Sequence, residues 1–347
     1  MRISAKSYAK INLGLQIDAK RPDGFHGLRT LYTTIALHDL ISVEVADATP
    51  TSAKPALVGD PGFGITVRCD HPDVPCDSTN TCYKAAERVL RALDRQAKVG
   101  ITIDKRLPVQ GGLGAGSSNA VATILALEKA LKSDLNAAER ARIAAEIGSD
   151  LNLFLYGGLT LGTGRGEEVW PLEDLPSIPL VVVTPEVGVS TAKAFEAWDQ
   201  LSPQQTKSAA AGDPEKLTAN QGSATMNMFN HAVYAWLGST AVSGVPALSG
   251  DRVEALLLDL VRTGISNDFE RVVFPEIPVL REVKCALERE GAAYAAMSGS
   301  GSTLYGLFRT AEEASQAASR LNAAGMKAVA TRTLPRSEYW RGMFEGQ

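Results

Sequence analysis

Hydrophobic and polar residues alternate in the segment YAKINLGLQI, residues 8–17. A period of two predicts a strand with one apolar face, and it sets Lys10 and Asn12 side by side on the opposite face. Further strands are predicted within residues 41–68, where ISVEV and GITVR flank a proline-rich loop at 50–62. The amino-terminal part of the chain is therefore expected to be rich in strands.

Helical patterns follow these strands. Residues 82–93 are expected to form a helix, and a strand at 101–107 leads through a glycine-rich loop into a second helix at 120–131. That second helix is apolar on nearly every side, which predicts that it is buried. After a further helix that ends at Gly148, we expect Asp150 at a bend between elements.

The composition of the chain changes at residues 171–179, PLEDLPSIP, which makes this segment the best candidate for a domain boundary. We therefore expect an N-terminal domain over residues 1–175 and a C-terminal domain over 176–347. Residues 202–225 and 238–250 are polar and poor in large apolar side chains, so both are expected to be exposed insertions.

The last third of the chain alternates helix and strand. A helix around Leu280 precedes the strand AAYAAM, the glycine turn SGSGS and the strand TLYGLF. Thr310 and Glu313 then begin a capped helix, and KAVATRTL forms a last strand. An order of this kind favours a ferredoxin-like, split βαβ domain.

Charge and composition exclude several classes of protein. Lys+Arg 35 against Asp+Glu 39 gives a net charge of −4, which argues against nucleic acid as a partner. No apolar run reaches the length of a signal peptide or a membrane span, so we expect a cytoplasmic protein with no membrane partner. A zinc site is one interpretation of the cysteines and histidine at 69–82, but their spacing differs from the usual paired pattern. Free thiols are the expectation, and no metal-ligating residue is assigned.

The glycine-rich loop PVQGGLGAGSSNA, residues 108–120, carries the clearest chemistry. Glycine lets the backbone approach a ligand closely, and the unpaired N–H groups at a helix start favour negative charge. Such a loop before a buried helix predicts a phosphate cradle. The alternative is a surface turn with Ser117 as helix cap, which leaves the glycines unexplained. The P-loop lysine is absent, and Ser117 stands where a dinucleotide fingerprint has its third glycine.

Phosphoryl transfer needs a phosphate cradle, a cation and a carboxylate that accepts the hydroxyl proton. Lys10, Asp150 and a second glycine turn at 298–302 supply the remaining parts. Taken singly, Lys10 is more simply a solvated lysine, Asp150 a helix cap and His26 a surface imidazole. Taken together, these residues indicate a nucleotide-binding enzyme of kinase type.

The order of AKINL at the start, LPVQGGLGAGSSNA in the middle and MSGSGS late resembles the three motifs of the GHMP small-molecule kinases. The element RPDGFHGL, residues 21–28, is similar to one that marks a single branch of that family. That branch acts on a cytidyl diphosphate derivative of methylerythritol in non-mevalonate isoprenoid synthesis. The likeness covers nearly the whole chain apart from 47–62 and the two insertions. It implies an α+β fold with an N-terminal nucleotide-binding domain and a C-terminal ferredoxin-like domain that completes the substrate site.

The resemblance also implies roles for individual residues. Lys10 and Asp150 match the catalytic pair: Asp150 takes or orients the proton of the substrate's 2-hydroxyl, and Lys10 steadies the aspartate and the transferring phosphoryl group. ATP is the expected cofactor, with Mg²⁺ whose ligands are not assigned. The residues expected around ATP are Asn80, Lys105, Pro108, Gly111, Gly112, Leu113, Gly114, Ala115, Gly116, Ser117 and Ser118. Those expected around the substrate are Asn12, Phe25, His26, Phe195, Gly299, Ser300 and Gly301, with His26 reading the cytosine edge.

Two positions depart from the family pattern. Asn152 stands where a proline usually follows Asp150, and Ala115 stands where the loop usually has another glycine. The first is expected to loosen the loop that carries Asp150, and the second strains the glycine loop if its φ is positive. Because neither departure removes a catalytic atom, we expect an active enzyme. Its substrate is expected to be a small cytidyl diphosphate, and the protein is expected to be a monomer or a homodimer. The alternatives are a sister kinase of homoserine or mevalonate type, a nucleotide-binding regulator without catalysis, and a dinucleotide-dependent oxidoreductase.

Overall fold

In the residues that it describes, the computed structural model of the chain contains two β-sheets, the helices that pack on them and a long hairpin between them. The predicted loop at 50–62 and the predicted insertions at 202–225 and 238–250 lie outside the described residues, so these expectations stay predictions. The described residues are 1–47, 64–201, 253, 257–258, 260–261 and 264–344.

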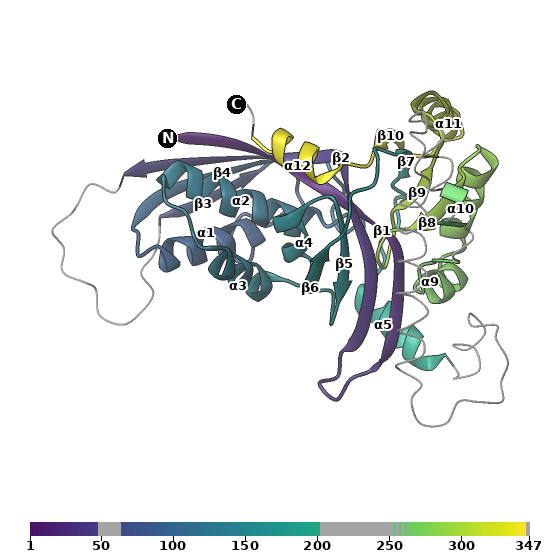
Figure 1. The fold of residues 1–347 in the computed structure, drawn as a ribbon, viewed down its shortest axis with the longest axis horizontal. Helices are drawn as coiled ribbons and strands as arrows, with labels where there is room; N and C mark the ends of the chain where they lie inside the picture. Colours follow the sequence, from purple (N-terminus) through teal and green to yellow (C-terminus); the bar gives the residue numbers. More distant parts are fainter. Residues whose placement is uncertain (48–63, 202–252, 254–256, 259, 262–263, 345–347) are drawn as a thin grey trace.

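The first sheet carries helices on one face (Figure 1). Its strands are β1 (Arg2–Lys20), β2 (His26–Asp47), β3 (Ile65–Cys69), β4 (Ala97–Asp104), β5 (Leu159–Thr163) and β6 (Glu168–Pro171), and its helices are α1 (Thr81–Ala92), α2 (Ala115–Leu131), α3 (Ala137–Ile147) and α4 (Leu151–Tyr156). The strands run in the order β3-β4-β2-β5-β6, and β1 pairs with β2. α2 packs against β1 and β2, and α1 packs against α2 and contacts β3. The apolar side chains between these helices and the sheet form the first core.

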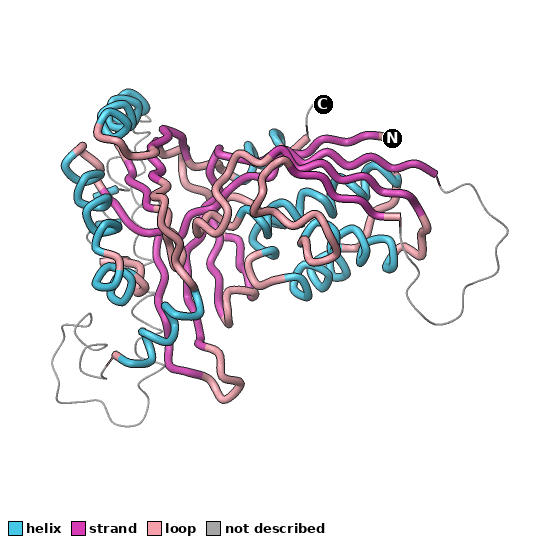
Figure 2. Tube along the Cα trace, turned by 180° about the vertical axis from the view of Figure 1, so that it is seen from behind, coloured by secondary structure: helices cyan, strands magenta, loops and turns pink. Residues whose placement is uncertain are grey.

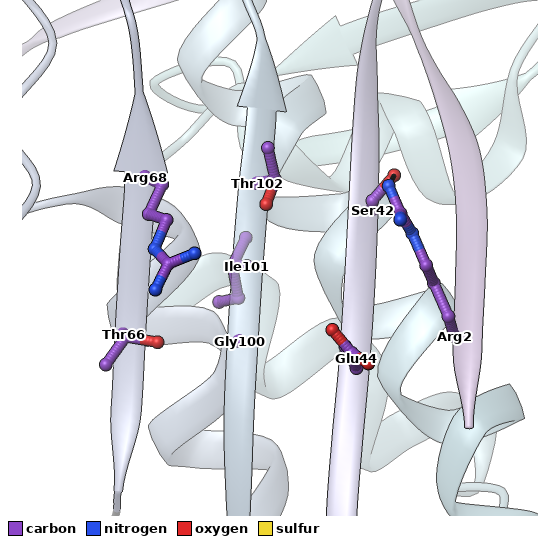
Figure 3. Close-up of a pocket in the computed structure, with 8 residues that line it drawn as sticks. All are labelled: Arg2, Ser42, Glu44, Thr66, Arg68, Gly100, Ile101 and Thr102. Carbon is purple, nitrogen blue, oxygen red and sulfur yellow. Dashed lines mark hydrogen bonds between the residues drawn. The ribbon is translucent and has the colours of Figure 1, made fainter.

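Where β1 to β4 lie side by side near Arg2, Glu44, Thr66 and Thr102, the face opposite the helices is polar. Figure 3 shows its side chains in front of the strands, with the helices behind them. A shallow pocket of about 250 Å³ on this face is lined by Arg2, Ser42, Glu44, Thr66, Arg68, Gly100, Ile101 and Thr102. None of these residues is among those that the sequence predicts for catalysis or binding.

The second sheet is antiparallel and has the order β10-β7-β9-β8. Its strands are β7 (Pro179–Val183), β8 (Tyr294–Met297), β9 (Leu304–Leu307) and β10 (Ala328–Arg332), and the helices around it are α5 (Thr191–Gln200), α9 (Glu270–Glu276), α10 (Pro278–Arg289) and α11 (Ala311–Ala323). α10 packs on β8 and β9, while α11 packs on β7 and β10. This strand order, with helices before β8 and before β10, is the split βαβ arrangement. The ferredoxin-like prediction is confirmed.

The β1–β2 hairpin joins the two sheets. Ile11 of β1 packs with Leu180 and Val182 of β7 in a core that both sheets share. The alternate residues Val181 and Val183 face the core beneath α10 and α11, so burial on both faces explains the unbroken apolar run of β7. Both views show the hairpin continuing to a turn that lies beside α5 (Figures 1 and 2).

The last helix, α12 (Arg336–Gly342), returns to the first sheet. The ring of Tyr339 packs on that of Tyr8, with 5.4 Å between centroids, and its hydroxyl donates to the carbonyl of Phe154 at 2.6 Å. α12 is thus fixed to the first sheet. The division into 1–175 and 176–347 stays a prediction.

The buried helix expected at 120–131 begins earlier than its apolar pattern, at Ala115. The residues Gly116, Ser117 and Ser118 have low helix propensity, so the sequence pattern assigns them to the loop. In the structure the hydroxyl of Ser7 on β1 lies 2.8 Å from that of Ser118. This tertiary hydrogen bond helps to hold the first helical turn.

The capping box of α11 generates a stability prediction. The hydroxyl of Thr310 accepts from the N–H of Glu313 at 3.1 Å, and the Glu313 carboxylate accepts from the N–H of Thr310 at 3.2 Å. Thr310→Ala is expected to lower the free energy of unfolding by about 1 kcal/mol, because it leaves a helix-end donor unpaired. Urea denaturation measures the loss. Ser315→Ala, on the exposed face of the same helix, is the matched control, and an equal loss in both variants would contradict the assignment.

Candidate active site

Three segments that are far apart in the sequence meet at the start of α2. The backbone N–H of Lys10 on β1 donates to the carbonyl of Leu113 at 3.0 Å. The hydroxyl of Ser298, after β8, donates to the carbonyl of Gly112 at 2.9 Å. The N–H of Thr303 donates to the carbonyl of Gly111 at 3.1 Å. The AKINL strand, the loop 111–114 and the turn 298–302 therefore form one structural unit, as three motifs of a single site would.

The loop requires glycine at two positions. Gly112 has φ +79°, and a Cβ there would lie 2.2 Å from the carbonyl oxygen of Ser298. Gly114 has φ +69°, and a Cβ there would lie 2.9 Å from the ring of Phe154. An exposed flexible turn would not need such close approach, so the packing favours a built loop at the N-terminus of α2. Such a terminus presents unpaired N–H groups and suits phosphate.

The other predicted cradle residues line the same segment. Pro108 packs under the loop, since a Cβ on Gly111 would lie 2.9 Å from its Cγ. Ser118 is buried and held by Ser7, whereas Ser117 is only half-buried. The exposed Gly116 accepts a hydrogen bond through its carbonyl from the hydroxyl of Thr81 at 2.8 Å, which ties α1 to α2.

Asn80 and Lys105, both expected near ATP, have structural partners. The Asn80 side chain caps α1 by accepting from the N–H of Cys82 at 2.8 Å, and it donates to the carbonyl of Pro75 at 2.6 Å. The ammonium of Lys105 donates to the carboxylate of Asp39 at 2.6 Å, and both side chains are buried. Their places around the nucleotide stay predictions.

Lys10 and Asp150 form an ion pair beside the loop. Lys10 Nζ lies 3.5 Å from Asp150 Oδ2, and it donates to Asn12 Oδ1 at 2.8 Å. Only 3% of Lys10 is exposed, and this burial lowers the pKa of its ammonium while Asp150 opposes the shift. The strand face shared by Lys10 and Asn12 is thus buried rather than solvated.

The side chain of Asp150 lies in the candidate site and does not cap a helix. It occupies the N-cap position of α4, yet its carboxylate makes no capping hydrogen bond. Its Oδ1 instead accepts from the hydroxyl of Tyr32 at 3.2 Å. Burial and the Asp150 charge raise the pKa of Tyr32 well above its ordinary value, so the hydroxyl stays protonated and donates. Sequence patterns gave no signal for Tyr32, because its partner lies far along the chain.

The two departures from the family pattern fit the structure. Ala115 is the first residue of α2 and lies outside the left-handed region, so its methyl group causes no backbone strain. The Asn152 amide donates to the carbonyl of Glu167 at 3.1 Å, which links α4 to the turn between β5 and β6. That hydrogen bond fixes the segment after Asp150 in place of the missing proline.

The residues predicted for the base lie at the turn of the hairpin and on α5. The ring of His26 stacks on Phe195, with centroids 5.1 Å apart and an interplanar angle of 9°. Phe195 meets Phe269 edge to face at 5.0 Å. Phe25 is 54% exposed, and the guanidinium of Arg165 lies 5.0 Å from its ring centroid. The structure thus brings His26 and Phe195 together, while Phe25 pairs with Arg165.

The turn 298–302 is held by a residue that sequence reasoning missed. The buried amide of Asn267 donates to the carbonyls of Met297 and Gly299, each at 2.7 Å. A Cβ on Gly299 would lie 3.6 Å from Lys10 Nζ and from Asn12 Oδ1, so this turn reaches the ion pair. Ser300 shares a hydrogen bond of 2.7 Å with Thr191, the first residue of α5, and Gly301 has φ +97°.

Comparisons with known proteins agree with this geometry. Residues 80–158 match the family model of the GHMP kinases N terminal domain, and residues 252–327 match that of the GHMP kinases C terminal. These matches define the class as a small-molecule kinase that uses ATP, and the predicted α+β fold is confirmed.

Curated relatives narrow the class. The chain is 35% identical over 304 residues to the 4-diphosphocytidyl-2-C-methyl-D-erythritol kinase of Solibacter usitatus, covering 88% of this chain and 80% of the relative. It is 32% identical to the enzyme of the same name from Caldanaerobacter subterraneus subsp. tengcongensis, over 90% of both chains. The chain therefore belongs to the GHMP kinases and, within them, to the 4-diphosphocytidyl-2-C-methyl-D-erythritol kinase family.

Solved structures give the same grouping. A crystal structure of 4-(cytidine 5'-diphospho)-2C-methyl-D-erythritol kinase aligns with a TM-score of 0.68 and 27% identity, covering 95% of this chain and 99% of the other. A homoserine kinase from Cytophaga hutchinsonii aligns with a TM-score of 0.64 at 18% identity and thus shares the fold. None of the helices in the described part of the chain has the length and apolarity to cross a bilayer.

A variant of the buried Lys105–Asp39 ion pair can distinguish a structural role of Lys105 from a role in nucleotide binding. Lys105→Met leaves the Asp39 carboxylate buried without its cation, so we expect the free energy of unfolding to fall by about 3–5 kcal/mol. Chemical denaturation measures this loss, and the KM for ATP measured on the same variant tests the predicted place of Lys105 near the nucleotide. A raised KM for ATP with intact stability would instead assign Lys105 to the nucleotide. Lys327→Met, which breaks the exposed pair with Glu186, is the control and should leave stability unchanged.

The buried ammonium of Lys10 predicts an alkaline limit of kinase activity. Burial lowers its pKa, so the charged form persists below that pKa and is lost as pH rises through it. Activity should therefore fall at a lower pH than an exposed lysine would give. Lys10→Arg, whose guanidinium stays charged, should lose about tenfold in kcat but no longer show this alkaline fall.

A pH profile of kcat tests this assignment. Lys98→Arg, at an exposed position of β4, is the control and should keep the wild-type profile. An unchanged alkaline limb in Lys10→Arg would contradict the role given to Lys10.

Proposed function

We propose that this chain transfers the γ-phosphoryl group of ATP to the 2-hydroxyl of 4-diphosphocytidyl-2-C-methyl-D-erythritol. The observation that carries the proposal is the Lys10–Asp150 pair, whose side chains meet at 3.5 Å beside the glycine loop. Phosphoryl transfer requires a carboxylate that accepts the hydroxyl proton and a cation that faces the transferred phosphoryl group. Membership of the family is the most direct support for the identity of the substrate.

Asp150 acts on the acceptor alcohol in this mechanism. Its Oδ2 takes the proton of the 2-hydroxyl as the oxygen forms a bond to the γ-phosphorus, while the bond from that phosphorus to the bridging oxygen breaks and ADP leaves. Tyr32 donates to Oδ1 and so holds the carboxylate in one orientation. Lys10 stays ionised through Asp150 and Asn12 and stabilises the negative charge that gathers on the phosphoryl oxygens.

The glycine loop and the first turn of α2 bind the triphosphate. Gly112 and Gly114 bring the backbone close enough for N–H groups to face phosphate, and a Cβ at either position would close that approach. ATP supplies the phosphoryl group when bound. Mg²⁺ is proposed to enter with the nucleotide phosphates. Among the described residues no group of His, Cys, Asp or Glu side chains is arranged to hold a metal ion, so no protein ligand is proposed for it.

The hairpin turn and α5 bind the cytidine end of the substrate. His26 is proposed to contact the edge of the cytosine, with Phe25 and Phe195 as its aromatic neighbours. Asn12 and the turn of Gly299, Ser300 and Gly301 lie between this end and the ion pair and are proposed to contact the rest of the substrate. We further propose that the enzyme is cytoplasmic, that it is a monomer or a homodimer, and that it has no nucleic-acid partner.

Asp150→Asn tests the function. The amide keeps the shape of the side chain but does not take a proton, so kcat should fall by about 100-fold or more with little change in the KM of either substrate. ADP release with ATP, Mg²⁺ and the cytidyl substrate measures it. Asp174→Asn, at a carboxylate away from the ion pair, is the control. Wild-type turnover of homoserine or mevalonate but not of the cytidyl substrate would overturn the proposal.

A further inference from the structure

His26 is held by a carboxylate from another element. Its Nε2 lies 2.6 Å from Oδ1 of Asp199, in the last turn of α5. The other oxygen of that carboxylate, Oδ2, accepts from Lys20 Nζ at 2.7 Å. Lys20 and His26 face each other across the hairpin, so the three side chains form one chain of hydrogen bonds between the hairpin and α5.

The position of Asp199 is unfavourable for the helix itself. Carboxylates near a helix C-terminus oppose the helix dipole, so α5 gains nothing from an aspartate there. The hydrogen bond from Lys20 is the main cause that lowers the pKa of the Asp199 carboxyl; burial opposes it, and the hydrogen bond from His26 adds to the lowering. Asp199 is therefore ionised and accepts only, which requires a proton on Nε2 of His26.

The second ring nitrogen is left for a ligand. Nδ1 of His26 makes no hydrogen bond to any residue that the structure describes. The ring is fixed in its plane by the parallel contact with Phe195, which is fixed in turn by Phe269. Only 6% of the His26 side chain is exposed, so ring and carboxylate are already arranged before any ligand binds.

We propose that Asp199 is a positioning residue that sets base specificity by holding His26 in the tautomer with its proton on Nε2. The lone pair on Nδ1 then accepts from the exocyclic amine of a cytosine. Uracil carries a carbonyl oxygen at that position, so it would set an acceptor against an acceptor. The inference rests on the proposed function, since it extends the role of His26 toward the cytidyl substrate.

Nitrogen NMR of the free protein tests the tautomer without any substrate. With ¹⁵N-labelled histidine at neutral pH, His26 is expected to show a proton-bearing Nε2 and an unprotonated Nδ1. Asp199→Asn should reduce this preference, because the amide both donates and accepts. A wild-type His26 with the proton on Nδ1 alone, or with both nitrogens protonated, would overturn the proposal.

Kinetics test the specificity. Asp199→Asn should raise the KM for the cytidyl substrate about tenfold and lower the preference over its uridine analogue about tenfold, with the KM for ATP unchanged. Lys327→Met, which removes an exposed cation that lies outside this chain of hydrogen bonds, is the control and should stay within about twofold of wild type. If wild type turns over neither analogue, the proposed function fails. If wild type prefers the cytidyl substrate and Asp199→Asn keeps that preference, only the inference about Asp199 fails.

Discussion

The burial of one ammonium group, that of Lys10, is the constraint on which the rest of this site depends. Removing a charge from water is costly unless partners replace the lost hydration. Lys10 is 3% exposed, and its partners are the side-chain oxygen Oδ1 of Asn12 at 2.8 Å and the Asp150 carboxylate at 3.5 Å. Each partner is held in turn, Asn12 by Thr30 at 2.7 Å and Asp150 by Tyr32. The Lys10–Asp150 ion pair is therefore formed without any bound substrate.

Glycine allows the other two motifs to approach this charge. Gly112 and Gly114 both have positive φ, and their missing side chains let the first loop touch the second turn and Lys10 itself. Gly299, also with positive φ, lies in ordinary contact distance of Lys10 from the side of the second sheet. The site therefore forms only when both sheets are packed on the β1–β2 hairpin, whose apolar face builds their shared core. This architecture couples the stability of the fold to the geometry of the site.

Sequence patterns predicted the local features well and the distant partners poorly. Alternation in residues 8–17 predicted that Lys10 and Asn12 share a face, and the capping box at Thr310 matched the start of α11, because both signals lie within a few residues. The pattern did not show that this face is buried, nor that Tyr32, Asn267 and Asp199 reach the predicted residues. Those contacts join segments more than 100 residues apart in most cases, as for Tyr32 with Asp150 and Asp199 with His26, which are separated by 118 and 173 positions. No periodicity along the chain indicates such pairs. Only the resemblance to a family predicted that these distant residues belong to one site.

The most direct measurement is a crystal structure with a non-hydrolysable ATP analogue and the cytidyl substrate bound together. The account predicts that the 2-hydroxyl oxygen lies within hydrogen-bond distance of the Asp150 carboxylate, about 2.6–3.2 Å, with Lys10 facing the terminal phosphate held by residues 112–118. An acceptor oxygen out of reach of Asp150, or a triphosphate bound away from the start of α2, would contradict it.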